Sequence, residues 1–518
     1  MRRFFLLSLF MAAVSVVSGQ EVDVSSFMRK AQDGNPEAQS ALGYAYYYGD
    51  GVKRDFGKAR KWWVKASGNG NMDAEFALGC SYYYGYGMKK DYAKAIEHWR
   101  VAAHKENANA LYAIGMAYSE GHGVEQDYEK AFLYYIDAAA RGNVEALTAL
   151  GVCYADGIGT KQNYKEAIEW WTLAANRDDD RALCFLGNCY ETGQGVAPDF
   201  KKSTEFYERA AELGNTFAQC HMGNCYATGH GVKQDTETSI KWYNLAAKNG
   251  DVVAQYILGN SMRLGQGVAQ NADSAFIWLT KAADQGDPKA MTALASCYRY
   301  GYGTKRDFDK AFRLYDGAAA MGDVIAMTNL AECYSEGIGV DISDSKAFSY
   351  CKKAADKDEP SAQNLLAYFY SEGAGTMRDL DKATFYWKKA AEQGYAEAQY
   401  NLAQCYDQGR GSIVPDKSEA FRWYKKAAEQ GYADAVYNLG ICYVEGNGTA
   451  KNYDEAFRCF KQAADKGDDA AQYNLAVCYA NGWGVERDDA KAMKLFRASA
   501  EAGNEDAKNA LASFKGRK

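Results

Sequence analysis

A spacing of 36 residues recurs through nearly the whole chain and constrains its fold more than any other feature. Glycine stands at Gly43 and then at every thirty-sixth residue as far as Gly259, and alanine continues the series from Ala295 to Ala403. One residue is inserted near residues 412–415, and the spacing resumes at Gly440. A unit of this length cannot bury a hydrophobic core alone, so the period is typical of repeat proteins whose units shelter one another.

Each unit has the sequence pattern of two helices. We call the residue of this series in each unit its phase position. Alanine stands five residues before the phase position and a large apolar residue stands one before it. Tyrosine stands three residues after it in twelve of thirteen units. Side chains spaced four apart form one buried stripe on a helix. Asn or Asp precedes the first helix in eleven of fourteen cases, as an N-cap. A Gly-x-Gly loop follows, whose first glycine suits the left-handed end of a helix, and the second helix carries residues such as Ala59, Trp63 and Ala66.

The pattern predicts an all-α protein, an α/α superhelical solenoid of about thirteen helix-turn-helix repeats over residues 35–503. We expect residues 20–34 to form an N-terminal capping helix. Residues 504–518 are expected to form a C-terminal capping helix that ends in a basic tail. No strand is predicted.

Residues 1–19 have the three-part pattern of a secretory signal peptide. Arg2 and Arg3 precede an apolar run from Phe4 to Val17, and small residues follow. That run is too short to cross the hydrocarbon core of a bilayer, which is about 30 Å thick. The sequence therefore predicts export without a transmembrane segment in the mature chain, to the periplasm, the exterior or, in a eukaryote, the lumen of the endoplasmic reticulum.

The composition narrows the class of partner. The chain is 47% apolar and 25% charged, which excludes a disordered protein. Its net charge is −7 and it has no run of basic residues, so we expect no nucleic-acid partner.

The thirteen cysteines show no Cys-x-x-Cys spacing, and eight of them stand two residues after a phase position. This repeated place favours small buried thiols that pack in a core. Two pairs, Cys333 with Cys351 and Cys442 with Cys459, place one thiol on each helix of a predicted hairpin. Each pair is a candidate disulfide, although spacing alone does not fix the Cα separation that a bridge needs.

The unit from Ala110 to Ala131 resembles the Sel1-like repeat, a relative of the tetratricopeptide repeat. The resemblance covers about 480 residues in thirteen copies. It implies an α/α solenoid that works as an adaptor for partner proteins or peptides, in membrane-associated complexes, lumenal quality control or the bacterial envelope.

The same resemblance implies an alternative function. One exported branch of the family, the Helicobacter cysteine-rich proteins, binds penicillin and has weak β-lactamase activity, which implies an envelope hydrolase or a cell-wall-ligand binder. That branch pairs cysteines eight residues apart, and no two cysteines here have that spacing.

The sequence shows no catalytic, cofactor or metal motif. None of the Gly-x-Gly loops continues to Gly-x-Gly-x-x-Gly or follows a strand, as phosphate-binding loops do. His122 and His230 each stand in the middle of such a loop, but three repeats apart, which is too far to share a metal ion. We therefore predict no enzymatic activity, no catalytic residue, no cofactor and no metal.

Aromatic residues near the loops are the candidate protein-binding residues, because aromatic side chains are enriched in interfaces. The alternative is that these rings pack against the adjacent repeat. The function predicted is that of an exported scaffold that binds partner proteins on its concave surface, in an oligomeric state that the sequence leaves open. The candidate residues are Tyr47, Tyr83, Tyr86, Tyr300, Tyr302 and Trp483.

Overall fold

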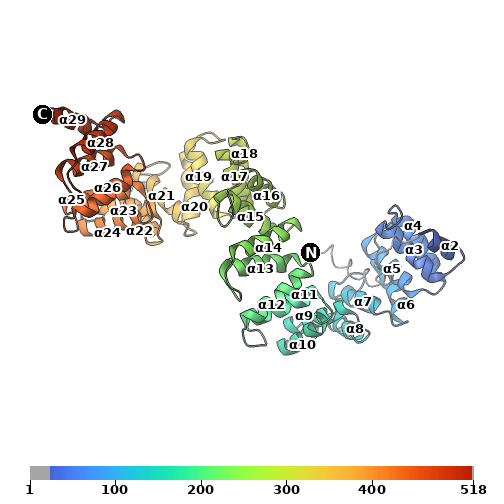
Figure 1. Cartoon of the computed structure of the whole chain (residues 1–518). Coiled ribbons are helices and arrows are strands. Elements are labelled where there is room, and N and C mark those ends of the chain that lie inside the picture. Colours follow the sequence, from blue (N-terminus) through green and yellow to red (C-terminus); the bar gives the residue numbers. More distant parts are fainter. Residues whose placement is uncertain (1–23, 516–518) are drawn as a thin grey trace. The chain divides into compact units, whose positions relative to one another are not determined.

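A computed structural model describes residues 24–515, and the expected signal peptide at residues 1–19 lies outside them. Within the described residues the chain forms 28 helices, α2 to α29, and no strand (Figure 1). This confirms the expected all-α solenoid of thirteen helix-turn-helix repeats. No helix in this part of the chain is both long and apolar enough to cross a membrane.

Thirteen hairpins, each a first and a second helix, follow α2 (Val24–Gln32) and precede α29 (Glu505–Lys515). Numbered 1 to 13 in chain order, they are α3 (Pro36–Tyr48) with α4 (Phe56–Gly68), α5 (Met72–Tyr84) with α6 (Tyr92–Ala103), α7 (Ala108–Glu120) with α8 (Tyr128–Ala140), α9 (Val144–Asp156) with α10 (Tyr164–Ala175), α11 (Asp180–Thr192) with α12 (Phe200–Glu212), α13 (Thr216–Thr228) with α14 (Thr236–Lys248), α15 (Val252–Leu264) with α16 (Ala272–Asp284), α17 (Pro288–Tyr300) with α18 (Phe308–Ala320), α19 (Val324–Glu336) with α20 (Asp344–Ala355), α21 (Pro360–Glu372) with α22 (Leu380–Glu392), α23 (Ala396–Gln408) with α24 (Lys417–Glu429), α25 (Ala433–Glu445) with α26 (Tyr453–Ala464), and α27 (Asp469–Asn481) with α28 (Asp489–Glu501).

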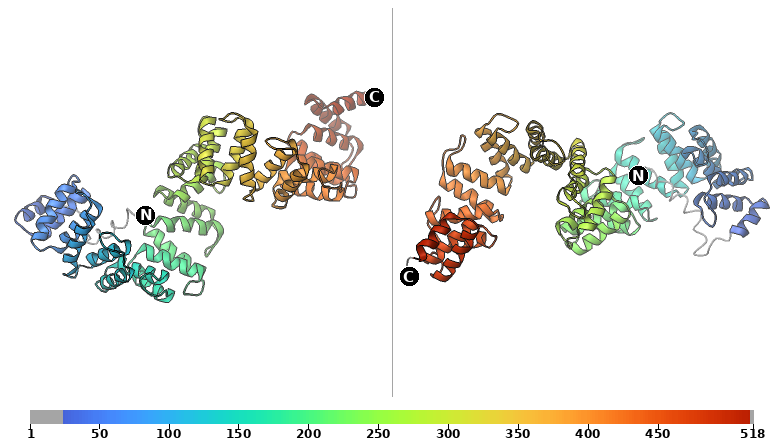
Figure 2. Two further views of the ribbon diagram at one scale, coloured as in Figure 1. Left: turned by 180° about the vertical axis from the view of Figure 1, so that it is seen from behind. Right: turned by 90° about the horizontal axis from the view of Figure 1, so that it is seen from above.

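The helices divide into two units, one up to Ala254 and one from Gln255, with the border inside α15. The first unit contains hairpins 1 to 6 and the second contains hairpins 8 to 13. Within each unit, successive hairpins lie side by side in chain order (Figure 2).

The first helices begin where the Asn and Asp pattern predicted. The Asn107 side chain, for example, accepts a hydrogen bond of 2.9 Å from the Ala110 amide at the start of α7. Eleven of the fourteen residues at this place form the equivalent bond, and the exceptions are Glu359, Tyr395 and Tyr432. A satisfied N-cap stabilises a helix by about 1 kcal/mol.

The two glycines of each Gly-x-Gly loop have different roles. Gly121 ends α7 in the left-handed conformation with φ 70°, as predicted. Gly123 also has a positive φ, 78°, and a Cβ atom there would lie 2.8 Å from the backbone carbonyl carbon of Tyr92, in the preceding hairpin. The second glycine therefore lets each loop pack closely against the start of the second helix of the preceding hairpin.

The glycine at the phase position allows the two helices of one hairpin to approach closely. A Cβ atom at Gly79 would lie 2.3 Å from the indole ring of Trp99, which is 1% exposed. The Trp99 indole N–H donates to the Phe76 carbonyl at 3.3 Å. The ring thus fills the space between α5 and α6, as close packing requires. Its buried indole nitrogen has a hydrogen-bond partner, as most buried polar groups in folded proteins do.

A glutamine clamp joins neighbouring hairpins. The Gln219 side chain donates to the Ala211 carbonyl of hairpin 5 at 3.0 Å and accepts from Asn249, at the end of hairpin 6, at 3.0 Å. Gln39 and Gln399 form the same pair of bonds in hairpins 1 and 11. In a buried place such satisfied amides fix the register of one hairpin on the next.

All thirteen cysteines are free thiols, so the structure contains neither candidate disulfide. Cys351 occupies the place that Trp63 and Trp99 fill in hairpins 1 and 2, and its thiol lies 3.2 Å from the Ala362 carbonyl of the next hairpin. The Cys351 thiol therefore contacts α21 and is not bonded to Cys333. The eight cysteines two residues after a phase position are buried, as expected of small core side chains.

The second candidate pair is separated by packing. Cys442 belongs to the large core cluster of hairpins 8 to 12, whereas Cys459 packs in a smaller cluster around Val436 and Leu439. The spacing of the two residues in the sequence was compatible with a bridge, but both thiols are free in the structure.

Candidate functional site

Three of the six candidate aromatic residues meet in the first unit, in a cluster that crosses hairpins 1 and 2. The ring of Tyr86 lies 5.4 Å from that of Tyr47 and stacks on Phe56 at 5.3 Å. The ring of Tyr84 stacks on that of Tyr86 and also contacts the ring of Tyr83, with the centroids of Tyr83 and Tyr84 4.8 Å apart. Tyr83 is only 6% exposed, and its hydroxyl donates to the Glu120 carboxylate at 2.6 Å. Most of this aromatic surface is thus used between the hairpins.

The middle residue of a Gly-x-Gly loop packs on the first residue of the preceding second helix. Tyr86 on Phe56 is one example, and Trp483 on Tyr453 is another, with centroids 4.9 Å apart and planes at 18°. The close approach of the second glycine places the loop there. Contact with the adjacent hairpin therefore accounts for the aromatic side chains of Tyr86 and Trp483.

Tyr302 has no such aromatic partner, because Ala272 stands at the start of the preceding second helix. Its side chain is 42% exposed, and the neighbouring Tyr300 is 49% exposed, with ring centroids 6.1 Å apart. Leu264 occupies the place of Tyr300 on the preceding first helix and is also exposed. We call Tyr300 and Tyr302 the exposed aromatic patch.

A buried guanidinium supports this patch. Arg299 lies 5.3 Å from the Tyr300 ring centroid and is 8% exposed. Its two terminal nitrogens bind Glu332 at 2.6 Å and Glu336 at 3.3 Å, both on α19. Burial alone would lower the pKa of Arg299, but the hydrogen bond and charge of Glu332 raise it above the ordinary value. Hairpins 8 and 9 are thereby tied together beside the patch, which holds Tyr300 on a rigid base.

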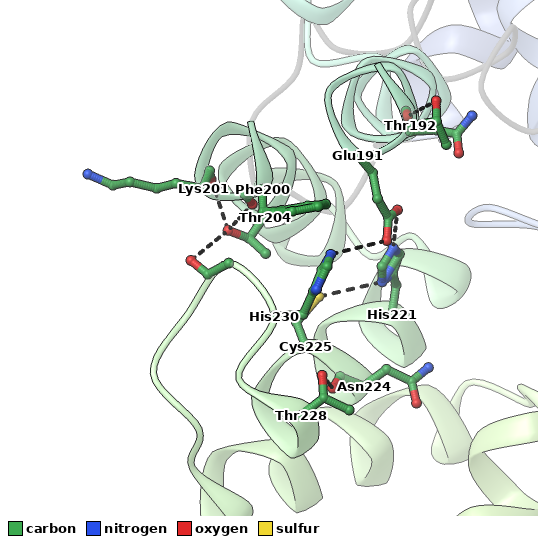
Figure 3. A network of polar contacts seen from close by, with 12 residues as sticks. Glu191, Thr192, Phe200, Lys201, Thr204, His221, Asn224, Cys225, Thr228 and His230 are labelled. Atoms are coloured by element: carbon green, nitrogen blue, oxygen red, sulfur yellow. Dashed lines mark hydrogen bonds and ion pairs between the residues drawn. The ribbon is translucent and has the colours of Figure 1, made fainter. Parts of the chain in front are cut away.

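A second group of polar side chains converges in the first unit and was missed in the sequence (Figure 3). His221 on α13 and His230 in the following loop both turn their Nε2 atoms toward Glu191, at the end of α11. The His221 distance is 3.1 Å and the His230 distance is 3.7 Å, to different carboxylate oxygens. We call these three residues the histidine–glutamate cluster. His230 could have been paired with Glu191 only by knowing that each loop packs on the preceding hairpin.

Neighbouring side chains hold the cluster in place. The ring of Tyr207 on α12 lies 3.9 Å from that of His221, and the ring of Phe200 lies 4.1 Å from that of His230. The Thr204 hydroxyl is 3.5 Å from the Gly231 carbonyl, so the loop that carries His230 is linked to α12. Figure 3 labels Phe200, Thr204 and the two histidines together with Glu191.

Cys225, His221 and Glu191 lie in the order nucleophile, base and carboxylate that thiol hydrolases use. The Cys225 sulfur is 3.6 Å from Nδ1 of His221. However, Cys225 is 2% exposed, and burial raises the pKa of its thiol to about 11. Burial also lowers the pKa of His221. A protonated thiol that a substrate cannot reach is not a nucleophile.

Two of the other three histidines, His98 and His122, have local partners. His98 binds the buried Glu75 carboxylate at 2.9 Å. Glu75 occupies the position of the clamp glutamine of other hairpins. His122 lies 2.7 Å from the Tyr83 hydroxyl and 2.8 Å from Glu120. Across residues 24–515 no three His, Cys, Asp or Glu side chains are arranged to hold a metal ion.

Comparison with known proteins identifies the repeat. The family model described as Sel1 repeat matches the chain thirteen times in succession between residues 36 and 504. A search of curated proteins finds no match.

Among solved structures, the chain is similar to c5321, described as a protective antigen of uropathogenic Escherichia coli strains with an SLR fold. The two share 26% identity with a TM-score of 0.64, over 96% of this chain and 98% of that one. A Sel1 repeat protein from Oxalobacter formigenes is 29% identical over 64% of this chain and 93% of its own, with a TM-score of 0.42.

Proposed function

Because the chain belongs to the Sel1 repeat family, we propose that it is an exported, non-catalytic scaffold that binds segments of partner proteins. The observation that carries the proposal is the exposed aromatic patch of the second unit. Elsewhere the mid-loop rings of Tyr86 and Trp483 are used in packing between hairpins, whereas Tyr300 and Tyr302 stay nearly half exposed. Solenoids commonly bind partners along the surface that their repeats present.

Two features suit the patch to protein binding. Tyrosine offers a large apolar ring and a hydroxyl and loses little conformational entropy when it is fixed, which makes it a frequent hot spot. In addition, the ion pairs of Arg299 with Glu332 and Glu336 hold the base of the patch before a partner arrives. Binding to a rigid surface costs less ordering entropy.

Export is supported by the signal-peptide pattern of residues 1–19. The non-catalytic role is supported by the burial of the Cys225 thiol, which lies beside a histidine and a carboxylate but out of reach of a substrate. No specific arrangement in residues 24–515 favours the alternative of an envelope hydrolase. A fluorescent penicillin tests that alternative directly, and saturable covalent labelling of the mature chain would favour it.

The proposal is tested by placing the photo-crosslinker p-benzoylphenylalanine at residue 302 of the mature chain and irradiating it in its native compartment. We expect adducts with one or a few proteins, identified by mass spectrometry. The matched control places the crosslinker at Tyr128, which is 44% exposed on a second helix. The proposal fails if residue 302 gives no adduct, or the same adducts as residue 128.

A further inference from the structure

Two imidazoles of hairpin 6 converge on one carboxylate of hairpin 5. His221 and His230 each place Nε2 beside a different oxygen of Glu191, at 3.1 and 3.7 Å (Figure 3). The three residues differ in accessibility, because the side chains of His221, Glu191 and His230 are 17%, 28% and 42% exposed. Protons can therefore reach the cluster from solvent, most directly at His230.

The charge of this cluster depends on the state of the two histidines. With both imidazoles neutral the cluster carries the single negative charge of Glu191, and with both protonated it carries one positive charge. Glu191 and His230 are the charged groups that act on His221. The titratable neighbours on the packed helices, Cys225 on α13 and Tyr207 on α12, have pKa values raised by burial and stay neutral near pH 7.

We propose that Glu191, His221 and His230 form a proton-operated contact between hairpins 5 and 6. A proton on His230 converts its contact with Glu191 into an ion pair that holds the 229–231 loop against α11. A second proton on His221 acts in the opposite direction, because one carboxylate then faces two cations. The contact is thus tightest when one histidine is charged.

Histidine titration by NMR tests the proposal in the full mature chain without any partner, so its outcome is independent of the proposed function. The chain has only five histidines, and each Cε1–H signal can be assigned by a single His→Gln variant. In Glu191→Gln we expect the midpoint of His221 to fall by roughly half a pH unit, since the charge of Glu191 that raises it is lost. In His230→Gln the midpoint of His221 should rise, because a neighbouring cation is removed.

The matched control is Glu120→Gln, which removes the carboxylate beside His122 in hairpin 3. It should move the His122 signal and leave His221 and His230 unchanged. Glu191→Asp should restore part of the effect of the lost charge. Amide hydrogen exchange adds a second readout, because protection of residues 229–231, corrected for intrinsic rates, should increase from pH 8 to about pH 6 in the wild type and not in Glu191→Gln.

Identical histidine midpoints in wild type and Glu191→Gln would overturn the proposal. So would a fall of the His221 midpoint in His230→Gln. Zinc ions that shift the His221 and His230 signals together at equimolar concentration would make the cluster a metal site and would also reject the proton-operated contact.

Discussion

The imidazole of His122 lies flat on the ring of Tyr92, with centroids 4.7 Å apart and planes only 4° apart. His122 is the middle residue of a Gly-x-Gly loop, and Tyr92 begins the second helix of the preceding hairpin. The relation recurs in Tyr86 on Phe56 and Trp483 on Tyr453. It is the contact that decides which loop aromatics remain available for a partner.

The second glycine of the loop should be essential for this contact. We expect Gly123→Ala to destabilise the first unit by about 1–3 kcal/mol, because the new Cβ would lie 2.8 Å from the Tyr92 backbone at a φ of 78°. Gly142→Ala is the matched control, since its φ is 89° but its nearest neighbour is 3.9 Å away. Urea unfolding followed by circular dichroism measures both, and equal losses would show that only the φ angle matters.

The exposed aromatic patch should affect binding and not stability. We expect Tyr300→Ser with Tyr302→Ser to weaken binding of the crosslinked partner at least tenfold, as loss of two hot-spot rings does. Thermal unfolding should be nearly unchanged, because both side chains are more than 40% exposed. Titration calorimetry with the purified partner makes the measurement, with Tyr128→Ser as the surface control.

The thiols should be free and mostly unreactive in the folded chain. We expect alkylation after denaturation without reductant to modify all thirteen cysteines, and mass spectrometry counts them. In the native chain Cys184, which is partly exposed, should react before Cys333, because Cys333 is 0% exposed and a reagent cannot reach it. Burial raises the pKa of both thiols, so accessibility sets the order. After digestion without reductant, a species two mass units below the summed masses of the Cys333 and Cys351 peptides would reveal the bridge that the structure lacks.

The histidine–glutamate cluster should make the first unit sensitive to acid. Burial lowers the pKa of His221 below its ordinary 6.5 in the folded state, so the unfolded chain takes up this proton first. The contribution of His221 to the free energy of unfolding should therefore decrease as the pH falls below about 6.5. His221→Gln should reduce this slope, and His104→Gln, at a position outside the cluster, should not. Denaturant unfolding at several pH values tests the difference.

The sequence determined the hairpins, because their signals are local. N-caps, the left-handed glycine and the buried alanine and cysteine columns act within a single helix or turn, so the period alone located them. Neither disulfide could be decided in that way, because the direction of Cys351 depends on the carbonyl of Ala362 in the next hairpin.

Only the tertiary structure decided which side chains could serve a partner or a proton. Tyr302 is exposed because Ala272, thirty residues earlier, offers it no ring, and His230 meets Glu191 because the loop of one hairpin lies on the one before. These contacts join residues of different repeats, and the repeat pattern gives the same prediction for every loop. The physical reason is that periodicity specifies how each unit folds, whereas exposure and charge arise from the particular pair of residues that two neighbouring units bring together.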